Sequence, residues 1–143
     1  MIRSEKELTT KIADCTTSFD AKFAGTNGKR AIVICGGTGC LSSNSASILA
    51  KFEEAIMAHD LSDKVTVNKV GCFGFCSQGP FVKIFPEDTL YHGVKVEDVE
   101  EIVNTDLINH QIVERLLYVD PMTKEKIQKQ DEINFYKKQK RVA

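Results

Sequence analysis

Two pairs of cysteines, each in a glycine-rich stretch, constrain the fold of this chain more than any other feature. Four residues separate Cys35 from Cys40, and three separate Cys72 from Cys76. The pairs lie 31 residues apart, and six of the nine glycines lie in or beside them. Glycine lets the backbone approach sulfur closely and point N–H groups at it. A fold that brings these two stretches together can therefore form a site with four thiolate ligands.

The segments that precede the cysteine pairs predict an open α/β sheet. Residues 31–34 form a continuous apolar run, as in a strand buried on both faces, and residues 64–70 alternate as a second strand. If these strands are parallel, the loops that follow them lie at the same end of the sheet. The remaining elements are helices over 44–59 and 96–103 and short strands at 81–85 and 90–91, which gives about four strands flanked by helices.

An amphipathic helix is expected over residues 4–24. Ser4 and Glu7 have the spacing of a capping box at its start. Its apolar residues recur at steps of three and four, which places them in one stripe: Leu8, Ile12, Cys15, Phe19 and Phe23. Free cysteine behaves in such a stripe as a small apolar side chain. We therefore expect Cys15 to be buried in packing and to have no ligand role.

The composition excludes several classes of protein. The net charge of −1 gives no general attraction to nucleic acid. The charged N-terminus lacks the apolar segment of a secretory signal, and no apolar run approaches the ~20 residues of a membrane-spanning helix. We expect a cytoplasmic protein without direct membrane insertion. In that compartment clustered cysteines are more often metal ligands or catalytic thiols than disulfides.

The composition changes after residue 105. Residues 108–117 predict one more amphipathic helix, and Asp120-Pro121 then interrupts the chain. Residues 123–141 contain seven Lys or Arg against three Asp or Glu, and their few apolar residues show no sustained period: Ile127, Ile133, Phe135 and Tyr136. We expect 105–143 to be a charged connector, within which residues 123–141 become ordered on contact and are not part of the core. It lacks the stacking aromatic series of a nucleic-acid-binding fold.

Four interpretations compete for the two cysteine pairs. An iron–sulfur cluster with four cysteine ligands accounts for the spacing, the glycines and the position after strands. Structural zinc also uses four cysteines but favours shorter spacings, and thiol–disulfide exchange prefers C-x-x-C at a helix start. Buried free thiols leave the glycines without a role. Phe73, Phe75 and Phe81 are placed to keep water off a cluster. The alternative to the cluster is a zinc module whose basic tail contacts a partner or nucleic acid.

These motifs resemble the thioredoxin-like 2Fe-2S ferredoxin domain. Residues 35–40 read Cys-Gly-Gly-Thr-Gly-Cys before a serine-rich helix start, and residues 71–76 read Gly-Cys-Phe-Gly-Phe-Cys shortly before Gly79-Pro80. The resemblance covers residues 29–104, after an N-terminal helix and turn at 1–28. It implies a thioredoxin-like sheet and one-electron transfer through a 2Fe-2S cluster. The ligands that it implies, two to each iron, are Cys35, Cys40, Cys72 and Cys76.

The tail is similar to the connector of a particular group of these proteins. Residues 112–117, Asp120-Pro121 and 135–141 resemble the segment before the flavin domain in the NADH-binding flavoprotein (beta) subunit of NAD(P)-linked electron-bifurcating hydrogenases and of complex I-type NADH dehydrogenases. This implies a parent NAD(P)H-dependent oxidoreductase with FMN, NAD(H) and a 4Fe-4S cluster beyond residue 143. The implied partners are other redox subunits or domains of that complex, and self-association is compatible with it. This chain alone is then an electron-transfer module that does not oxidise NADH.

Overall fold

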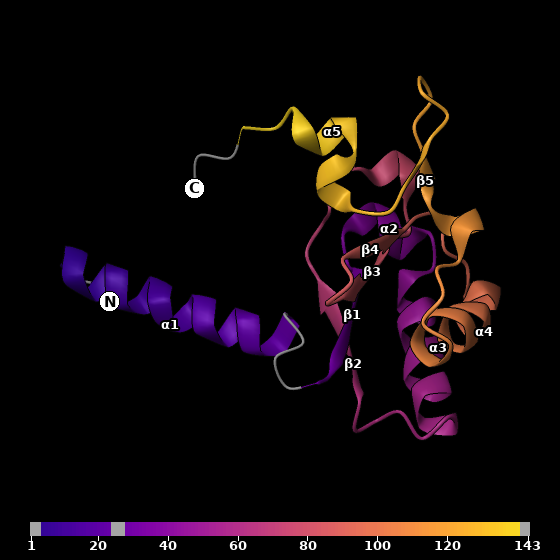
Figure 1. The fold of residues 1–143 in the computed structure, drawn as a ribbon, viewed down its shortest axis with the longest axis horizontal. Helices are drawn as coiled ribbons and strands as arrows, with labels where there is room; N and C mark the ends of the chain where they lie inside the picture. The colour runs from indigo at the N-terminus through magenta and orange to yellow at the C-terminus, as the bar shows by residue number, and fades with distance from the viewer. Residues whose placement is uncertain (1–3, 24–27, 141–143) are drawn as a thin grey trace.

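The centre of the protein is a four-stranded mixed sheet with the strand order β2-β1-β3-β4 (Figure 1). The structure is a computed structural model that describes residues 4–23 and 28–140. The strands are β1 (Arg30–Cys35), β2 (Val65–Val70), β3 (Val82–Phe85) and β4 (Thr89–Tyr91). β1 is parallel to β2 and antiparallel to β3, and β3 is antiparallel to β4. All four expected strands are confirmed, as is the parallel pairing of the first two.

Helices and a small hairpin complete the chain. The α-helices are α1 (Glu5–Phe23), α2 (Thr38–Ser42), α3 (Ser45–Ala58), α4 (Val99–Ile102) and α5 (Asn134–Lys137). Four short 3-10 helices are η1 (Cys76–Gln78), η2 (Val96–Asp98), η4 (Glu114–Leu116) and η5 (Gln130–Glu132), and η3 (Val103–Ile108) is a π-helix. The antiparallel pair β5 (Tyr118–Val119) and β6 (Lys126–Ile127) forms the hairpin. Within the described ranges, no helix combines the length and apolar composition of a membrane span.

The two faces of the sheet carry separate apolar clusters. α3 and α4 lie on one face and pack on Ile32 and Ile34 of β1, which are fully buried (Figure 1). Since successive residues of a strand point to opposite faces, Cys35 belongs to the other face. There it forms a second buried cluster with Phe81 and Leu90. The sheet therefore separates the main core from the first cysteine of the motif.

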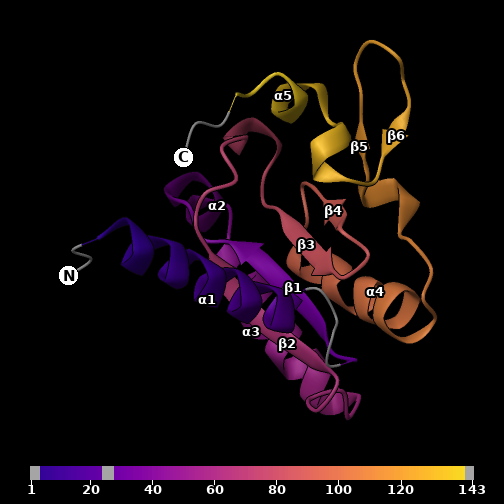
Figure 2. The same ribbon diagram turned by 60° about the vertical axis from the view of Figure 1, so that its left-hand side comes forward.

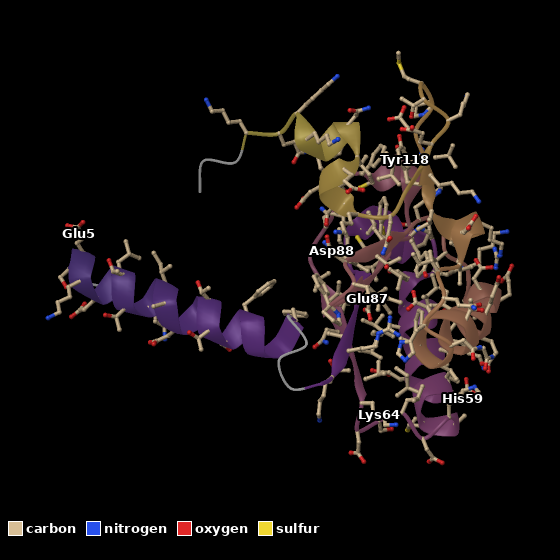
Figure 3. All side chains as sticks on the ribbon, in the orientation of Figure 1. Glu5, His59, Lys64, Glu87, Asp88 and Tyr118 are labelled. Carbon is tan, nitrogen blue, oxygen red and sulfur yellow. The ribbon has the colours of Figure 1, made fainter. Side chains whose placement is uncertain are left out.

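Helix α1 extends away from the sheet on the side opposite α3 (Figure 2). The helix itself is confirmed, and the Ser4 hydroxyl accepts the expected cap hydrogen bond from the Glu7 N–H at 3.2 Å. Glu5 lies at the end farthest from the sheet (Figure 3), and at the other end the ring of Phe23 contacts that of Phe85, with 5.3 Å between centroids. The stripe between these ends is exposed.

The prediction that Cys15 is buried is therefore wrong. Cys15 is exposed, and its stripe neighbours Ile12 and Phe19 are 57% and 56% exposed. The apolar period correctly identifies one face of the helix. It does not tell whether another element covers that face, and in the described part of the chain none does along the middle of α1.

The segment after residue 105 is packed, and the prediction that residues 123–141 lie outside the core is wrong, because Ile133 and Tyr136 are buried. The helix expected over 108–117 does not form in that described stretch, where η3 ends at Ile108 and η4 (Glu114–Leu116) is a single short turn. Val113 and Leu117 join the core beside α3 and α4. Isolated bridges between Tyr91 and Leu117 and between Thr89 and Lys129 extend the sheet. A role of this segment as a connector to a further domain stays a prediction.

The side chain of Asp120 connects two later parts of this segment by hydrogen bonds. Its Oδ1 accepts hydrogen bonds from the N–H groups of Met122 at 2.8 Å and Thr123 at 3.2 Å, which close the turn of the hairpin. Its Oδ2 accepts one from the Asn134 side chain at 2.8 Å, at the start of α5. The two backbone donors hold the pKa of Asp120 below its usual range, so it is ionised at neutral pH. One carboxylate thus links the hairpin to α5.

Candidate metal centre

The two cysteine-containing loops begin side by side at one edge of the sheet. Cys35, the last residue of β1, is paired in register with Val70, the last residue of β2. The N–H of Gly36 donates to the carbonyl of Val70 at 2.8 Å, so the chains are still in contact as the loops start. The sequence prediction that these loops meet is confirmed by this pairing.

The four cysteines of these loops come together. The sulfurs of Cys72 and Cys76 are 3.7 Å apart. The thiol of Cys35 is close enough to contribute to the pKa shifts of Cys40, Cys72 and Cys76. Cys15 is elsewhere, in a shallow cavity lined by other residues of α1. Segments 31 residues apart in the sequence therefore supply one group of four thiols.

This group has a buried side and an exposed side. Cys35 and Cys40 are each 1% exposed, whereas Cys72 and Cys76 are exposed. Burial, and then the neighbouring Cys35 thiol, raise the pKa of Cys40 to about 12. The N–H of Gly74 donates to the Cys72 sulfur at 3.2 Å and lowers the pKa of that thiol, while Cys72 in turn raises the pKa of Cys76. Cys72 is thus the thiol best prepared to act as a thiolate, and binding a metal at Cys40 must release a proton.

At two glycines, the backbone of one loop lies almost in contact with a cysteine of the other loop. A Cβ at Gly79 would lie 2.7 Å from the Cys40 sulfur, and a Cβ at Gly37 would lie 3.1 Å from the Cys72 sulfur and 2.9 Å from its Cβ. Each glycine thus faces a cysteine of the other loop. This close approach explains the glycines at positions 37 and 79, because a side chain at either position would push the loops apart.

Replacing Gly79 by alanine is expected to reduce the amount of metal that the protein retains. The new methyl group would overlap the Cys40 sulfur, and Cys40 is buried and has no room to retreat. We expect the iron content of purified Gly79→Ala to fall below that of the parent, with faster loss in air. Gly71→Ala is the matched control, since a Cβ there meets nothing within 4 Å. Equal iron in both variants would contradict the proposed role of the contact.

The aromatic side chains that the sequence indicated cover part of the group, and residues of the tail add to this cover. Phe73 and Phe75 pack on Phe81, with centroids 5.6 and 6.3 Å apart. Ile133 and Tyr136 of the tail join the buried cluster that contains Cys35 and Cys40. The sequence signal for them was weak, because two apolar positions in a charged segment define no period.

The residues fit a cluster held by four thiolates in donor type and surroundings. Sulfur is the only donor that the four side chains offer, and thiolates hold 2Fe-2S clusters. The close glycines leave room beside sulfur that a Cβ would fill. Within residues 4–23 and 28–140, no three His, Cys, Asp or Glu side chains are arranged as they would be around a single metal ion. The cysteines are thus neighbours with the donor type of a cluster site, but they are not arranged around one point.

Comparison with known proteins identifies the fold and the cofactor. Residues 8–106 match the family model described as Thioredoxin-like [2Fe-2S] ferredoxin. The chain belongs to this family. It is 48% identical over 77 residues to a 2Fe-2S ferredoxin of Clostridium pasteurianum, covering 54% of this chain and 76% of that one. It is 34% identical over 79 residues to a 2Fe-2S ferredoxin of Aquifex aeolicus, covering 54% and 71%.

A solved structure agrees with this assignment. The thioredoxin-like [2Fe-2S] ferredoxin from Aquifex aeolicus superposes with a TM-score of 0.57 at 30% identity, covering 62% of this chain and 88% of that chain. The expected thioredoxin-like α/β fold is confirmed, and so is the 2Fe-2S cofactor. The protein is an electron-transfer ferredoxin. Residues 107–143 lie beyond the segment that matches the family model.

Proposed function

We propose that Cys35, Cys40, Cys72 and Cys76 are the four cluster ligands of this ferredoxin. The observation that carries this proposal is the interleaving of the two loops, in which glycines of each loop contact cysteine sulfur of the other. The four cysteines lie together at one edge of the sheet, and sulfur is the only donor that they offer. They therefore provide four ligands of one chemical type, thiolate. Cys15, exposed on α1, has no part in it.

The chain's own residues determine how such a site works. A bound 2Fe-2S cluster takes up and releases one electron. The N–H of Gly74 stabilises negative charge on the Cys72 sulfur, and hydrogen bonds of this kind raise the reduction potential. Burial of Cys35 and Cys40 excludes water from one side. The loop with Cys72 and Cys76 faces outward and is the side from which an electron reaches a partner.

We further propose that the chain works within a cytoplasmic NAD(P)H-dependent oxidoreductase of the hydrogenase or NADH dehydrogenase type. The support is the resemblance of residues 112–117 and 135–141 to the connector of such subunits, and the position of this segment beyond the part shared with the family. Its partners would be the flavin-containing and other redox domains of that complex. By itself the chain should not oxidise NADH.

Two measurements test these proposals separately. An anaerobically purified sample should contain two irons and two sulfides per chain and give a rhombic EPR signal on reduction. One zinc per chain and no signal would overturn the ligand proposal in favour of the structural zinc alternative. A tagged chain recovered from its native host should then bring with it flavin and an NAD(P)H-reducible activity. Recovery of the coloured ferredoxin alone would contradict the parent complex and leave the cluster standing.

A further inference from the structure

We propose that the C-terminal segment 118–137, here named the C-terminal clamp, positions the loop that carries Cys72 and Cys76 and thereby adjusts the cluster's potential and its access to water. The proposal rests on the ligand set proposed above. It concerns residues that the family segment does not include, since the match ends at residue 106. The clamp comprises β5, β6, η5 and α5, which lie together above the edge of the sheet where the loops meet (Figures 1 and 2).

The first contact of the clamp is a hydrogen bond to the loop backbone. The hydroxyl of Tyr136 donates to the carbonyl of Phe73 at 3.0 Å. Phe73 lies between Cys72 and Gly74, whose N–H donates to the Cys72 sulfur. Tyr136 is 6% exposed, so this hydrogen bond is largely shielded from competing water. Its loss would free the Phe73–Gly74 peptide unit, which itself carries the N–H that donates to the Cys72 sulfur.

The second contact is aromatic and involves the residue before Cys76. The ring of Phe75 stacks on Phe135, with centroids 4.6 Å apart and planes 12° from parallel. Tyr118, labelled in Figure 3, approaches the same ring from β5 at 5.7 Å, and Tyr136 meets it edge-on at 6.3 Å. Three rings of the clamp thus surround one side chain of the loop. The Phe75 ring therefore packs against the clamp on one side and against Phe81 on the other.

The clamp is anchored independently of the loop, so it can hold the loop in place. Ile133 is 1% exposed and lies in the cluster with Leu90, Cys35 and Cys40. Three hydrogen bonds join the clamp to β3 and β4: Leu90 N–H to the Gln128 carbonyl at 2.9 Å, Gln128 Nε2 to Thr89 Oγ1 at 2.9 Å, and Lys83 Nζ to Gln130 Oε1 at 3.1 Å. The Asp120 carboxylate fixes the hairpin to α5. These contacts with the sheet therefore hold α5 in a fixed position.

These contacts act on two of the quantities that set an iron–sulfur potential. Solvent exposure and hydrogen bonds to sulfur both change that potential. The clamp covers Phe73 and Phe75 and fixes the peptide unit that carries the Gly74 N–H, so it affects both. Tyr136 and Phe135 are positioning residues, because they act through their contacts with Phe73 and Phe75 of the loop.

The test compares cluster-loaded Tyr136→Phe and Phe135→Ala with the parent. Both variants should keep two irons per chain but show a shifted reduction potential and altered EPR g-values. Hydrogen exchange of the peptide 71–78 should be about threefold to tenfold faster in Tyr136→Phe, the change expected when one shielded hydrogen bond is lost. Phe135→Tyr should restore the parent potential, because it keeps the stacked ring. Lys137→Ala, adjacent but exposed, is the matched control.

The outcomes separate this inference from the proposed function. Variants that hold two irons and match the parent in potential, EPR and exchange would overturn the clamp while the ligand set stands. If no protein in the series held iron, the ligand proposal would fail. Faster exchange of 71–78 in the variants would still support the clamp's hold on the loop in that case, and unchanged exchange would overturn it too.

Discussion

Replacing Cys40 by serine is expected to remove most of the iron from the protein. Serine at this position offers a hydroxyl that keeps its proton near neutral pH, whereas the ligand must be an anion. Cys40 is 1% exposed and its sulfur faces Gly79 across the gap between the loops, so no water or other side chain can take its place. Iron per chain, visible absorption and EPR of the reduced protein measure the loss.

The four ligand positions should differ in the size of this effect. Cys35→Ser should resemble Cys40→Ser, because both side chains are buried. Cys72 and Cys76 lie on an exposed loop that has room to adjust, so their serine variants should retain more iron but lose it faster in air. Equal losses at all four positions would contradict the distinction between a buried and an exposed side.

Cys15→Ser is the matched control for this series. Cys15 is exposed on α1 and lies in a cavity formed by other residues of that helix. Its variant should keep the iron content and EPR signal of the parent. Loss of iron in Cys15→Ser would overturn its exclusion from the ligand set, and retention of all iron in Cys40→Ser would overturn the set itself.

The parts of the fold that the sequence predicted correctly are those with a local signal. The strand at β1 is a run of apolar residues, and α3 has an apolar face with a helical period, so each pattern identifies its element. The loops after β1 and β2 carry the cysteines, and parallel pairing of adjacent strands brings them together. The candidate site followed from these two facts.

The errors concern contacts between distant parts of the chain. Cys15 lies in a regular apolar stripe, yet burial depends on a partner surface that the stripe does not identify. Ile133 and Tyr136 lie in a charged segment without a period, yet they are buried because β3, β4 and the cysteine loops accept them. The residues that surround Phe75 were missed for the same reason: they belong to the tail.

Replacing Asp106 by alanine is expected to cost about 3–5 kcal/mol of stability, the usual penalty for removing one partner of a buried ion pair. Asp106 is 3% exposed in the π-helix η3. Its carboxylate accepts hydrogen bonds from Arg30, at the start of β1, and from the Tyr91 hydroxyl, in β4. Arg30 also donates to the Asp106 carbonyl at 2.6 Å. Burial raises the pKa of Tyr91, so it remains a donor at neutral pH.

The expected loss is large because the variant leaves a charge without its main partner. The Arg30 side chain is only 11% exposed, and its remaining partner, Glu87, is 40% exposed at 3.1 Å. Tyr91 would also lose its acceptor, while its hydroxyl still accepts from the Val113 N–H at 3.1 Å. Val113 lies in the packed part of the tail, so weakening this link should loosen the tail as well as the sheet.

Urea unfolding of the cluster-loaded protein measures the difference, with Glu87→Ala as the matched control. Glu87 pairs with the same arginine from an exposed position, so its removal should cost less than about 1 kcal/mol. A lower midpoint with an unchanged slope identifies a loss of stability rather than a change in the unfolded state. If both variants unfold at the same midpoint, the buried pair contributes no more than the exposed one. The tie between β1, β4 and the tail would then have to come from the apolar packing of Leu117 and Val113 and from the backbone hydrogen bonds between β4 and the tail.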